Sequence, residues 1–186
     1  MVKYVSLMIA LVALSSISLF AQSSMSVGPQ LGIYKSQDAD NAKLMGGAAL
    51  RLRIDQGFGI EGSINYREEE YNNGYLTAKS WPVMVTGLVY PLPVAYGAIG
   101  AGWYNTSVDY NYPPGYNGGP GMNSSDTEQK FGWHFGGGVE VPVGQVGKLV
   151  GDIRYVFLDY NFKTLPGTNG VNSDFYVITA GMQFGL

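Results

Sequence analysis

The last twelve residues of this 186-residue chain alternate strictly between two kinds of side chain. A period of two residues is that of a β-strand with two unlike faces. One face is apolar, carries an aromatic ring near each end and runs to the final residue, so the pattern predicts a strand whose outer face meets lipid. The apolar set is Tyr176, Ile178, Ala180, Met182, Phe184 and Leu186, and the smaller, more polar set is Phe175, Val177, Thr179, Gly181, Gln183 and Gly185.

The first residues predict export from the cytoplasm. Lys3 precedes an apolar run over 4–14, and a serine-rich stretch then leads to Ala21. This order is typical of a secretory signal peptide, so we expect a signal peptide over 1–21 and a single mature domain over 22–186. An N-terminal membrane helix is the alternative, but serines interrupt the run and a helical span needs about 20 mostly apolar residues.

The composition fits a strand-built membrane protein. The chain has 27 Gly, 14 Tyr and only 13% charged residues, against about a quarter in ordinary domains. Glycine fits a crowded barrel interior, and tyrosine favours the membrane interface. The absence of cysteine excludes disulfides and thiolate metal sites. A net charge of −3 without basic clusters argues against a nucleic-acid partner.

Eight segments alternate in this way or have strand composition, and the connections between them differ in length. Three connections are short, whereas four are longer and polar. Short turns at one end and long loops at the other are typical of transmembrane barrels, with both termini on the periplasmic side. The segments are 25–34, 44–54, 58–67, 77–90, 95–105, 129–141, 149–158 and 175–186; the short connections are 55–57, 91–93 and 142–148, and the long ones 35–43, 68–76, 106–128 and 159–174.

Several of these segments resemble the outer-membrane β-barrel domains of the small OmpA/OmpX type. The resemblance implies an all-β fold, an eight-stranded antiparallel up-and-down transmembrane β-barrel, in the outer membrane of a Gram-negative-type bacterium. The family usually ends on Phe, whereas this chain ends on Leu186. The resemblance rests on Trp81-Pro82-Val83-Met84-Val85, on 96–104, on Gly136-Gly137-Gly138-Val139-Glu140, on Asp152-Ile153-Arg154-Tyr155 and on Gly181-Met182-Gln183-Phe184.

Partners follow from the same resemblance. The final strand is similar to the C-terminal signal that the barrel-assembly machinery recognises. We also expect contact with outer-membrane lipid and lipopolysaccharide, an unidentified extracellular or envelope partner, and a monomer. The expected assembly signal is Tyr176, Ile178, Met182, Phe184 and Leu186.

Charged residues fall on the expected inner face of the strands. An eight-stranded barrel is only just wide enough to be filled by its own side chains, so these charges must pair. They predict a structural ion-pair core; a gate whose pairs exchange to pass ions is the alternative. The expected lumen cluster is Arg51, Arg53, Glu61, Arg67, Lys130, His134, Glu140, Asp152 and Arg154. The two segments 77–90 and 95–105 are apolar on both faces, so which face points inward stays open.

The connection 55–57 fixes one register in detail. A three-residue hairpin favours Gly at its last position, here Gly57, where a left-handed backbone is needed. Pairing Ile54 with Phe58 then sets Arg51 opposite Glu61, and predicts an ion pair between them inside the barrel.

His134 is the only histidine, and it does not predict an enzyme. Outer-membrane lipid deacylases of similar size have a His and a Ser two residues apart on the lipid-facing side. Here Gly136 occupies the second position and His134 points inward. We therefore expect no catalytic residue, no metal and no cofactor.

The outer loops are where function is expected, because the barrel itself is a scaffold. Tyr110, Tyr112 and Tyr116 lie among Gly, Asn and Pro, a mixture found in adaptable binding loops as well as in solvated tips. Glu68-Glu69-Glu70 predicts a solvated loop edge, or a divalent-cation bridge to lipopolysaccharide phosphates.

The expected function is an envelope scaffold or a surface-interaction, adhesion-like protein, with at most minor ion leakage. A secreted lipocalin-like barrel that binds an apolar ligand is one alternative, and it requires apolar inward and polar outward faces. An outer-membrane lipid-modifying enzyme is the other, and it requires a His–Ser or His–Asp–Ser set.

Removal of 184–186 should abolish insertion into the outer membrane. The deletion takes away the terminal lipid-facing contacts of the closing strand and leaves its neighbour unpaired at that end. We expect periplasmic degradation, measured by the amount of heat-modifiable protein in isolated outer membranes. Normal surface levels of the truncated protein would contradict the predicted assembly signal.

Overall fold

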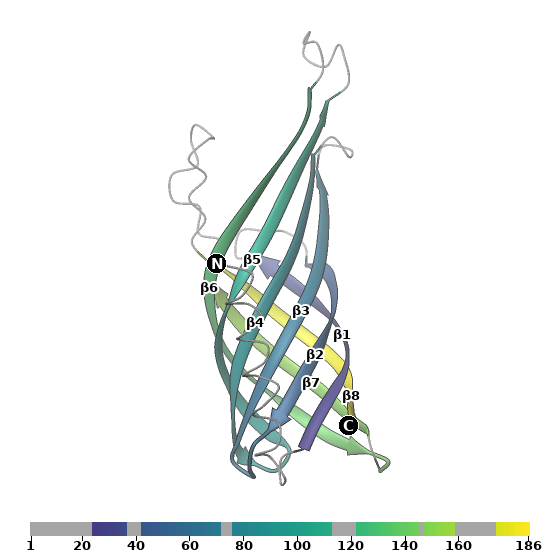
Figure 1. Ribbon diagram of the computed structural model, residues 1–186, viewed down its shortest axis with the longest axis vertical. Coiled ribbons are helices and arrows are strands. Elements are labelled where there is room, and N and C mark those ends of the chain that lie inside the picture. The colour runs from purple at the N-terminus through teal and green to yellow at the C-terminus, as the bar shows by residue number, and fades with distance from the viewer. Residues whose placement is uncertain (1–23, 37–41, 72–75, 113–121, 146, 159–173) are drawn as a thin grey trace, which may run out of the picture.

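Strands with one apolar face require lipid on that face and a filled interior on the other, and a closed sheet meets both needs. The computed structural model describes residues 24–36, 42–71, 76–112, 122–145, 147–158 and 174–186. Eight antiparallel strands close in chain order into a barrel, which confirms the predicted fold class (Figure 1). The strands are β1 (Ser24–Ser36), β2 (Lys43–Arg53), β3 (Phe58–Tyr71), β4 (Leu76–Leu92), β5 (Ala95–Tyr112), β6 (Met122–Val143), β7 (Gly147–Phe157) and β8 (Phe175–Gly185).

The expected signal peptide over 1–21 lies outside the described residues. Within the described part of the chain, no helix has the length and apolar character needed to cross a membrane. The first and last described strands meet at the end with the short turns, where Ser26 pairs with Gly185.

Side chains around the barrel are apolar outside and polar inside. Ile99 and Ile153 are 62% and 51% exposed on the outer surface, whereas Glu61 is 1% exposed in the lumen. This alternation was expected for β1, β2, β3, β6, β7 and β8, and the burial pattern confirms it. A lipocalin-like barrel requires the opposite arrangement, so the structure overturns that alternative.

Strands β4 and β5 are apolar on both faces because the lumen has apolar layers as well as charged ones. Met84 and Tyr104 belong to one buried apolar cluster, and Leu88 and Tyr96 belong to another. Tyr90 joins the second cluster at 6% exposure. As an amphipathic ring at the short-turn end, Tyr90 is expected at the membrane interface. It points into the lumen instead, where its hydroxyl donates to Glu140.

Four strands continue well beyond the closed wall (Figure 1). The pairing of β2 with β3 ends at Tyr66, and the pairing of β6 with β7 ends at Trp133. Beyond these points β3 to β6 still pair with one another, out to Tyr112 opposite Met122. We call this part the protruding sheet: 67–71 of β3, 76–80 of β4, 105–112 of β5 and 122–132 of β6.

The protruding sheet corrects the expected loops 68–76 and 106–128. Glu68-Glu69-Glu70 lie within β3, and Tyr110 and Tyr112 lie within β5. These residues do not alternate between apolar and polar in the sequence. Pairing between neighbouring strands therefore continues where the hydrophobic period has stopped.

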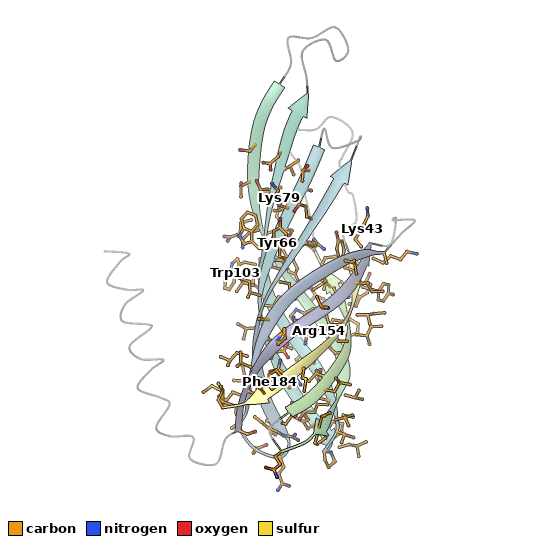
Figure 2. All side chains as sticks on the ribbon, turned by 90° about the vertical axis from the view of Figure 1, so that its right-hand side faces the viewer. Lys43, Tyr66, Lys79, Trp103, Arg154 and Phe184 are labelled. Atoms are coloured by element: carbon orange, nitrogen blue, oxygen red, sulfur yellow. The ribbon has the colours of Figure 1, made fainter. Side chains whose placement is uncertain are left out.

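Outward aromatic rings mark the level at which the closed wall ends. Trp133 stacks on Phe157 at a centroid distance of 4.0 Å, and Trp103 meets Phe131 edge-on at 5.9 Å. Along the axis of Figure 2, Phe184 lies toward the short-turn end, Trp103 about halfway, and Lys79 beyond it. The register brings Trp81, Trp103 and Trp133 close together in the wall, since Trp103 lies opposite Val83 and Trp133 lies opposite Ala101. None of the three is at the end of its strand.

Tryptophan fluorescence should locate this level in a bilayer. In variants that keep one of Trp81, Trp103 and Trp133, with the other two replaced by Phe, we expect stronger quenching by lipids brominated near the carbonyl groups than by lipids brominated at the chain ends. The reason is that amphipathic rings favour the headgroup level. Stronger quenching by chain-end bromines for any of the three would contradict the common level.

Candidate functional site

The middle of the lumen is filled by buried charged side chains, and Glu61 is at its centre. Arg51 donates from Nε to Glu61 Oε2 at 3.1 Å, and Arg154 donates from Nη2 to Glu61 Oε1 at 2.7 Å. The exposed fractions of Arg51, Glu61 and Arg154 are 3%, 1% and 5%. Two guanidinium groups from β2 and β7 thus meet on one carboxylate from β3, and this contact joins opposite walls of the barrel.

The hairpin between β2 and β3 sets this geometry. Asp55 Oδ1 accepts from the backbone N–H groups of Gly57 and Phe58, at 2.6 and 2.7 Å, and closes the turn. Arg51 then lies opposite Glu61, so the predicted register and the predicted ion pair are confirmed. The predicted reason is wrong, since among the described residues the glycine with a left-handed φ is Gly144 rather than Gly57.

A second carboxylate, Glu140 of β6, extends the network toward the short-turn end. It accepts from Arg51 Nη1 at 2.9 Å, from Arg53 Nη1 at 2.8 Å and from Lys148 Nζ at 3.3 Å. The Tyr90 hydroxyl donates to it at 3.1 Å, and the Arg53 guanidinium lies 3.9 Å from the centre of the Tyr90 ring. Each oxygen of Glu140 therefore has a donor.

The third carboxylate, Asp152 of β7, connects the network to the remaining strands. It accepts from Arg154 Nη2 at 2.7 Å, from the Tyr96 hydroxyl at 3.0 Å and from Thr179 Oγ1 at 2.9 Å. The Tyr96 hydroxyl in turn accepts from Arg51 Nη2 at 3.1 Å. Hydrogen bonds thus run continuously from Lys148 to Arg154, as an ion-pair core requires.

Glycines make room for this network. A Cβ at Gly138 would lie 2.5 Å from the Tyr96 hydroxyl oxygen, and one at Gly100 would lie 2.7 Å from His134 Nε2. The close approach of a buried side chain therefore requires glycine at both positions.

The other expected lumen residues occupy separate places. Arg67 lies over the rings of Tyr34 and Phe175, at 4.4 and 4.7 Å, and not among the carboxylates. Lys130 forms its ion pair with Glu128, at 2.7 Å, with side chains 23% and 35% exposed. Placing Lys130 in the cluster was wrong, because β6 extends further outward than its hydrophobic pattern indicates.

His134 is fully buried, and its Nε2 lies 2.9 Å from the Thr86 hydroxyl. That hydroxyl also accepts from Arg154 Nη1 at 3.2 Å and is itself fully buried. Neither side chain of this pair is therefore exposed in the described structure. Among the described residues, no three His, Cys, Asp or Glu side chains gather in a way that could hold a metal ion.

Sequence reasoning missed Tyr90, Tyr96, Thr86 and Lys148. The first three lie on β4 and β5, whose inward face the sequence left open. The signal that could have found them is the pairing of strands, since Tyr96 and Gly138 are partners on β5 and β6 and must share a face.

Comparisons with known proteins agree with this architecture. Residues 7–184 match the family model of the outer membrane protein beta-barrel domain. A major outer membrane protein from Thermus thermophilus superposes with a TM-score of 0.67 at 13% identity, covering 89% of this chain and 100% of that one. Neisserial surface protein A gives 0.57 at 13% identity, covering 87% and 96%. Ail, the attachment invasion locus protein of Yersinia pestis, gives 0.52 at 16% identity, covering 88% and 97%. No curated relative matches the sequence.

Glu61→Ala should destabilise the barrel by about 3 to 5 kcal/mol, because it leaves two buried guanidinium groups without their shared acceptor. The measurement is the free energy of unfolding in urea, in lipid vesicles. Glu128→Ala is the matched control, since it breaks the more exposed pair with Lys130 and should cost about 0 to 1 kcal/mol.

The same network should keep small sugars out of the lumen. Vesicles that contain the wild-type protein should not swell in small sugars at the rate that a porin gives. Porin-like swelling would show that the lumen is open. Equal losses of unfolding free energy in Glu61→Ala and Glu128→Ala would show that the Glu61 ion pairs are not buried.

Proposed function

This chain belongs to the outer membrane protein β-barrel domain family, and we propose that it is a surface-interaction, adhesion-like protein of a Gram-negative-type bacterium. Its place is the bacterial outer membrane, which the family and the apolar outer face support. The filled lumen supports a scaffold role for the barrel, since the charged core leaves it no evident route for solutes. The protruding sheet is the observation that carries the proposal.

Many side chains of the protruding sheet are polar and hydrogen-bonded to one another. Thr106 donates to Ser80 at 3.1 Å, and Gln129 donates to Asn105 at 2.7 Å. The Lys79 ammonium donates to Asp109 at 3.0 Å, and this hydrogen bond and the nearby carboxylate raise the pKa of Lys79, so Lys79 stays charged at neutral pH. A surface of this kind is costly in hydrocarbon. The sheet therefore stands outside the membrane.

The protruding sheet has two edges whose backbone has no strand partner in the described chain. One is 67–71 of β3, and the longer one is 122–132 of β6. Unpaired edges are templates on which an extended segment of another protein adds as a further strand. The edges therefore support recognition of an extended segment of an extracellular or envelope partner.

The residues expected to take part in binding, the tyrosines of 110–116 and the glutamates of 68–70, lie near these edges where the structure describes them. Tyr110 and Tyr112 lie in β5 next to the longer edge, with side chains outside the described atoms, and Tyr116 lies outside the described residues. Glu68 is exposed at the edge of β3, where it accepts from the Tyr66 hydroxyl at 2.7 Å. A cation bridge from 68–70 to lipopolysaccharide phosphates stays a prediction.

Two relatives by fold support the same proposal. Ail is an attachment invasion locus protein and the neisserial protein is a surface protein. We also expect the outer face to contact outer-membrane lipid and lipopolysaccharide, and the barrel-assembly machinery to bind β8. The lipid-modifying alternative has no support, because it requires an accessible His–Ser or His–Asp–Ser set and the only histidine is buried beside Thr86.

Replacing 108–126 with an Asn-Gly turn should remove the interaction and keep the barrel. The turn suits a two-residue hairpin and leaves Ser107 opposite Thr127, as in the native pairing. We expect normal amounts of heat-modifiable protein, but several-fold fewer adherent bacteria on epithelial cells when a non-adherent strain displays the variant instead of the wild type.

The control is Ile99→Ala, on the lipid-facing surface of the same strand, which should leave adherence unchanged. Equal adherence of the shortened and wild-type proteins at equal surface levels would overturn the adhesion-like role and leave the barrel as an envelope scaffold.

A further inference from the structure

The lipid-facing wall of β6, β7 and β8 is hollowed by a groove of about 410 Å³. Glycines occupy 136–138, so β6 carries no side chain between Phe135 and Val139. Gly137 is the partner of Ile153 on β7, and the wall is therefore bare beside that isoleucine. The residues that line the groove are Phe135, Gly136, Ile153, Tyr155, Phe157 and Tyr176.

Aromatic rings form the sides of the groove and hold one another in place. The Tyr155 ring meets the rings of Phe157 and Tyr176 edge-on, each at a centroid distance of 4.7 Å. The Phe135 ring lies 6.1 Å from that of Tyr155. Phe135 and Tyr176 are 47% and 48% exposed, so the groove is apolar, preformed and open to the lipid.

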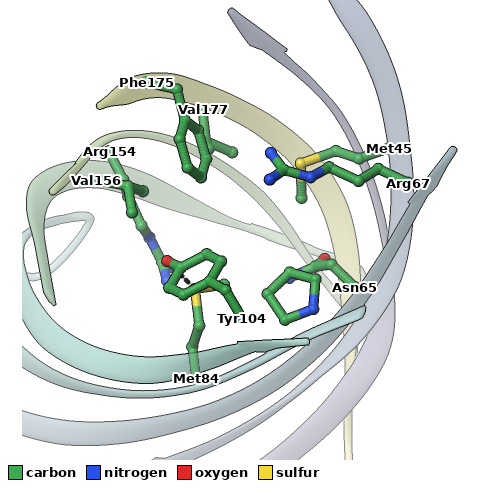
Figure 3. A pocket seen from close by; sticks show the side chains of 10 residues that line it. Met45, Asn65, Arg67, Met84, Tyr104, Arg154, Val156, Phe175 and Val177 are labelled. Carbon is green, nitrogen blue, oxygen red and sulfur yellow. Dashed lines mark hydrogen bonds between the residues drawn. The ribbon is translucent and has the colours of Figure 1, made fainter. Parts of the chain in front are cut away.

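The groove does not open into the lumen. Phe175 and Val177, which flank Tyr176 in β8, point inward, and Figure 3 shows them with Val156 of β7 on the lumen side of the wall. All three side chains are buried. A ligand in the groove therefore lies against the outside of a closed wall and does not pass through it.

A cation stands at the outer rim of the groove. Lys35 is opposite Tyr176 in the pairing of β1 with β8, and opposite residues share a face of the sheet, so Lys35 is on the lipid-facing side. It is exposed, and it is the last but one residue of β1, at the end away from the short turns. A lysine in this place lays its stem along the wall and raises its ammonium to the headgroup level. The groove and the ammonium together suit a lipid that has an acyl chain and an anionic head group.

The carboxylate of Asp174, next to Phe175 in the chain, is engaged within the protein. One oxygen accepts from the Tyr155 hydroxyl at 3.0 Å, and the other accepts from the Leu158 backbone N–H at 3.1 Å. The ion pairs of the described chain are made by lysines and arginines other than Lys35. Asp174 thus fixes the Tyr155 ring, and the charge of Lys35 faces the lipid.

We infer that this groove holds one acyl chain of a lipopolysaccharide molecule and that Lys35 binds a phosphate of the same molecule. The inference rests on the proposed outer-membrane location, and it gives the expected contact with lipopolysaccharide a definite place. A methylene group is close in size to a water molecule, which takes about 30 Å³ in the liquid, so the groove has room for on the order of a dozen methylenes. Lipopolysaccharide carries its phosphates on the sugars from which the acyl chains extend, so one molecule supplies both contacts.

Two other occupants fit this face less well. In a two-fold dimer through this wall, groove would face groove and stay unfilled. A phospholipid could fill the groove, but lipopolysaccharide forms the outer leaflet, and Lys35 is at the outer end of its strand.

Native mass spectrometry of the purified barrel in detergent tests the site. The probe is diphosphorylated lipid A, added together with an equal amount of phosphatidylglycerol, an anionic phospholipid. We expect a saturable complex of one lipid A per barrel, because one groove and one rim cation form the site, and a clearly weaker complex with phosphatidylglycerol. Absence of a saturable one-to-one complex, or equal binding of the two lipids, would overturn the inference.

Ile153→Trp tests the groove. The larger side chain fills the groove and still meets lipid, so the barrel should fold and the lipid A complex should be lost. The matched control is Ile178→Trp, because Ile178 is the partner of Ile153 on β8, is 48% exposed and lies outside the groove lining. This control should bind like the wild type, whereas binding by Ile153→Trp at the wild-type level would show that the groove is not the site.

Lys35→Met tests the phosphate contact. It keeps the apolar stem and removes the charge, so lipid A should bind about fivefold more weakly, as expected for the loss of one lysine at an anionic surface. Lys43→Met is the control, since Lys43 is opposite the buried Tyr34 and therefore on the lumen side of the same rim (Figure 2). Equal affinities of these two variants would overturn the phosphate contact. The measurement contains no host cell or partner protein, so its failure is distinct from a failure of the adhesion-like role.

Discussion

Glu61 is the residue on which the closed lumen depends. It binds guanidinium groups from the neighbouring strand β2 and from β7, and the second contact joins opposite walls of the barrel. A charge buried this far is tolerated only where its partners are in place. Several features put these partners in place. They are the register of the β2–β3 hairpin, the glycines next to Tyr96 and His134, and the positions of Glu140 and Asp152. The polar interior therefore specifies how the strands align, while the lipid-facing surface specifies only that they are strands.

The protruding sheet depends on a different balance. Within the wall, β3 to β6 have lipid outside and the charged core inside. Beyond Tyr66, β3 no longer pairs with β2, and beyond Trp133, β6 no longer pairs with β7. Hydrogen bonds between paired polar side chains, such as Thr127 to Ser107 at 3.2 Å, replace apolar packing there. The same strands run through both regions without a loop between them, so the outer sheet continues directly from the barrel wall. An edge already paired on one side loses less entropy on binding than an unpaired loop would.

The sequence predicts the barrel well because lipid imposes period two on six of the eight wall strands, all but β4 and β5. It predicts the Arg51–Glu61 pair because one short turn fixes that register. It does not predict the facing of β4 and β5, since Leu88 in the lumen and Val89 in lipid are equally apolar. Nor does it predict the outer ends of β3 to β6, where neither face meets hydrocarbon and the alternation disappears. The misplacement of Lys130 and the missed roles of Tyr90 and Tyr96 follow from these two gaps, because each residue's environment is set by its neighbours on adjacent strands.

The outer half of the lumen brings the two halves of the structure together. Arg67 is in β3 at the level where the wall ends, and its guanidinium closes the apolar layer over Tyr34 and Phe175. Below it, the Asn65 amide oxygen accepts from Gln30 Nε2 at 2.7 Å, and this hydrogen bond links β1 to β3 across β2. The outer layer of the lumen is thus held by ring contacts and amide hydrogen bonds, whereas the layer beneath it is held by ion pairs.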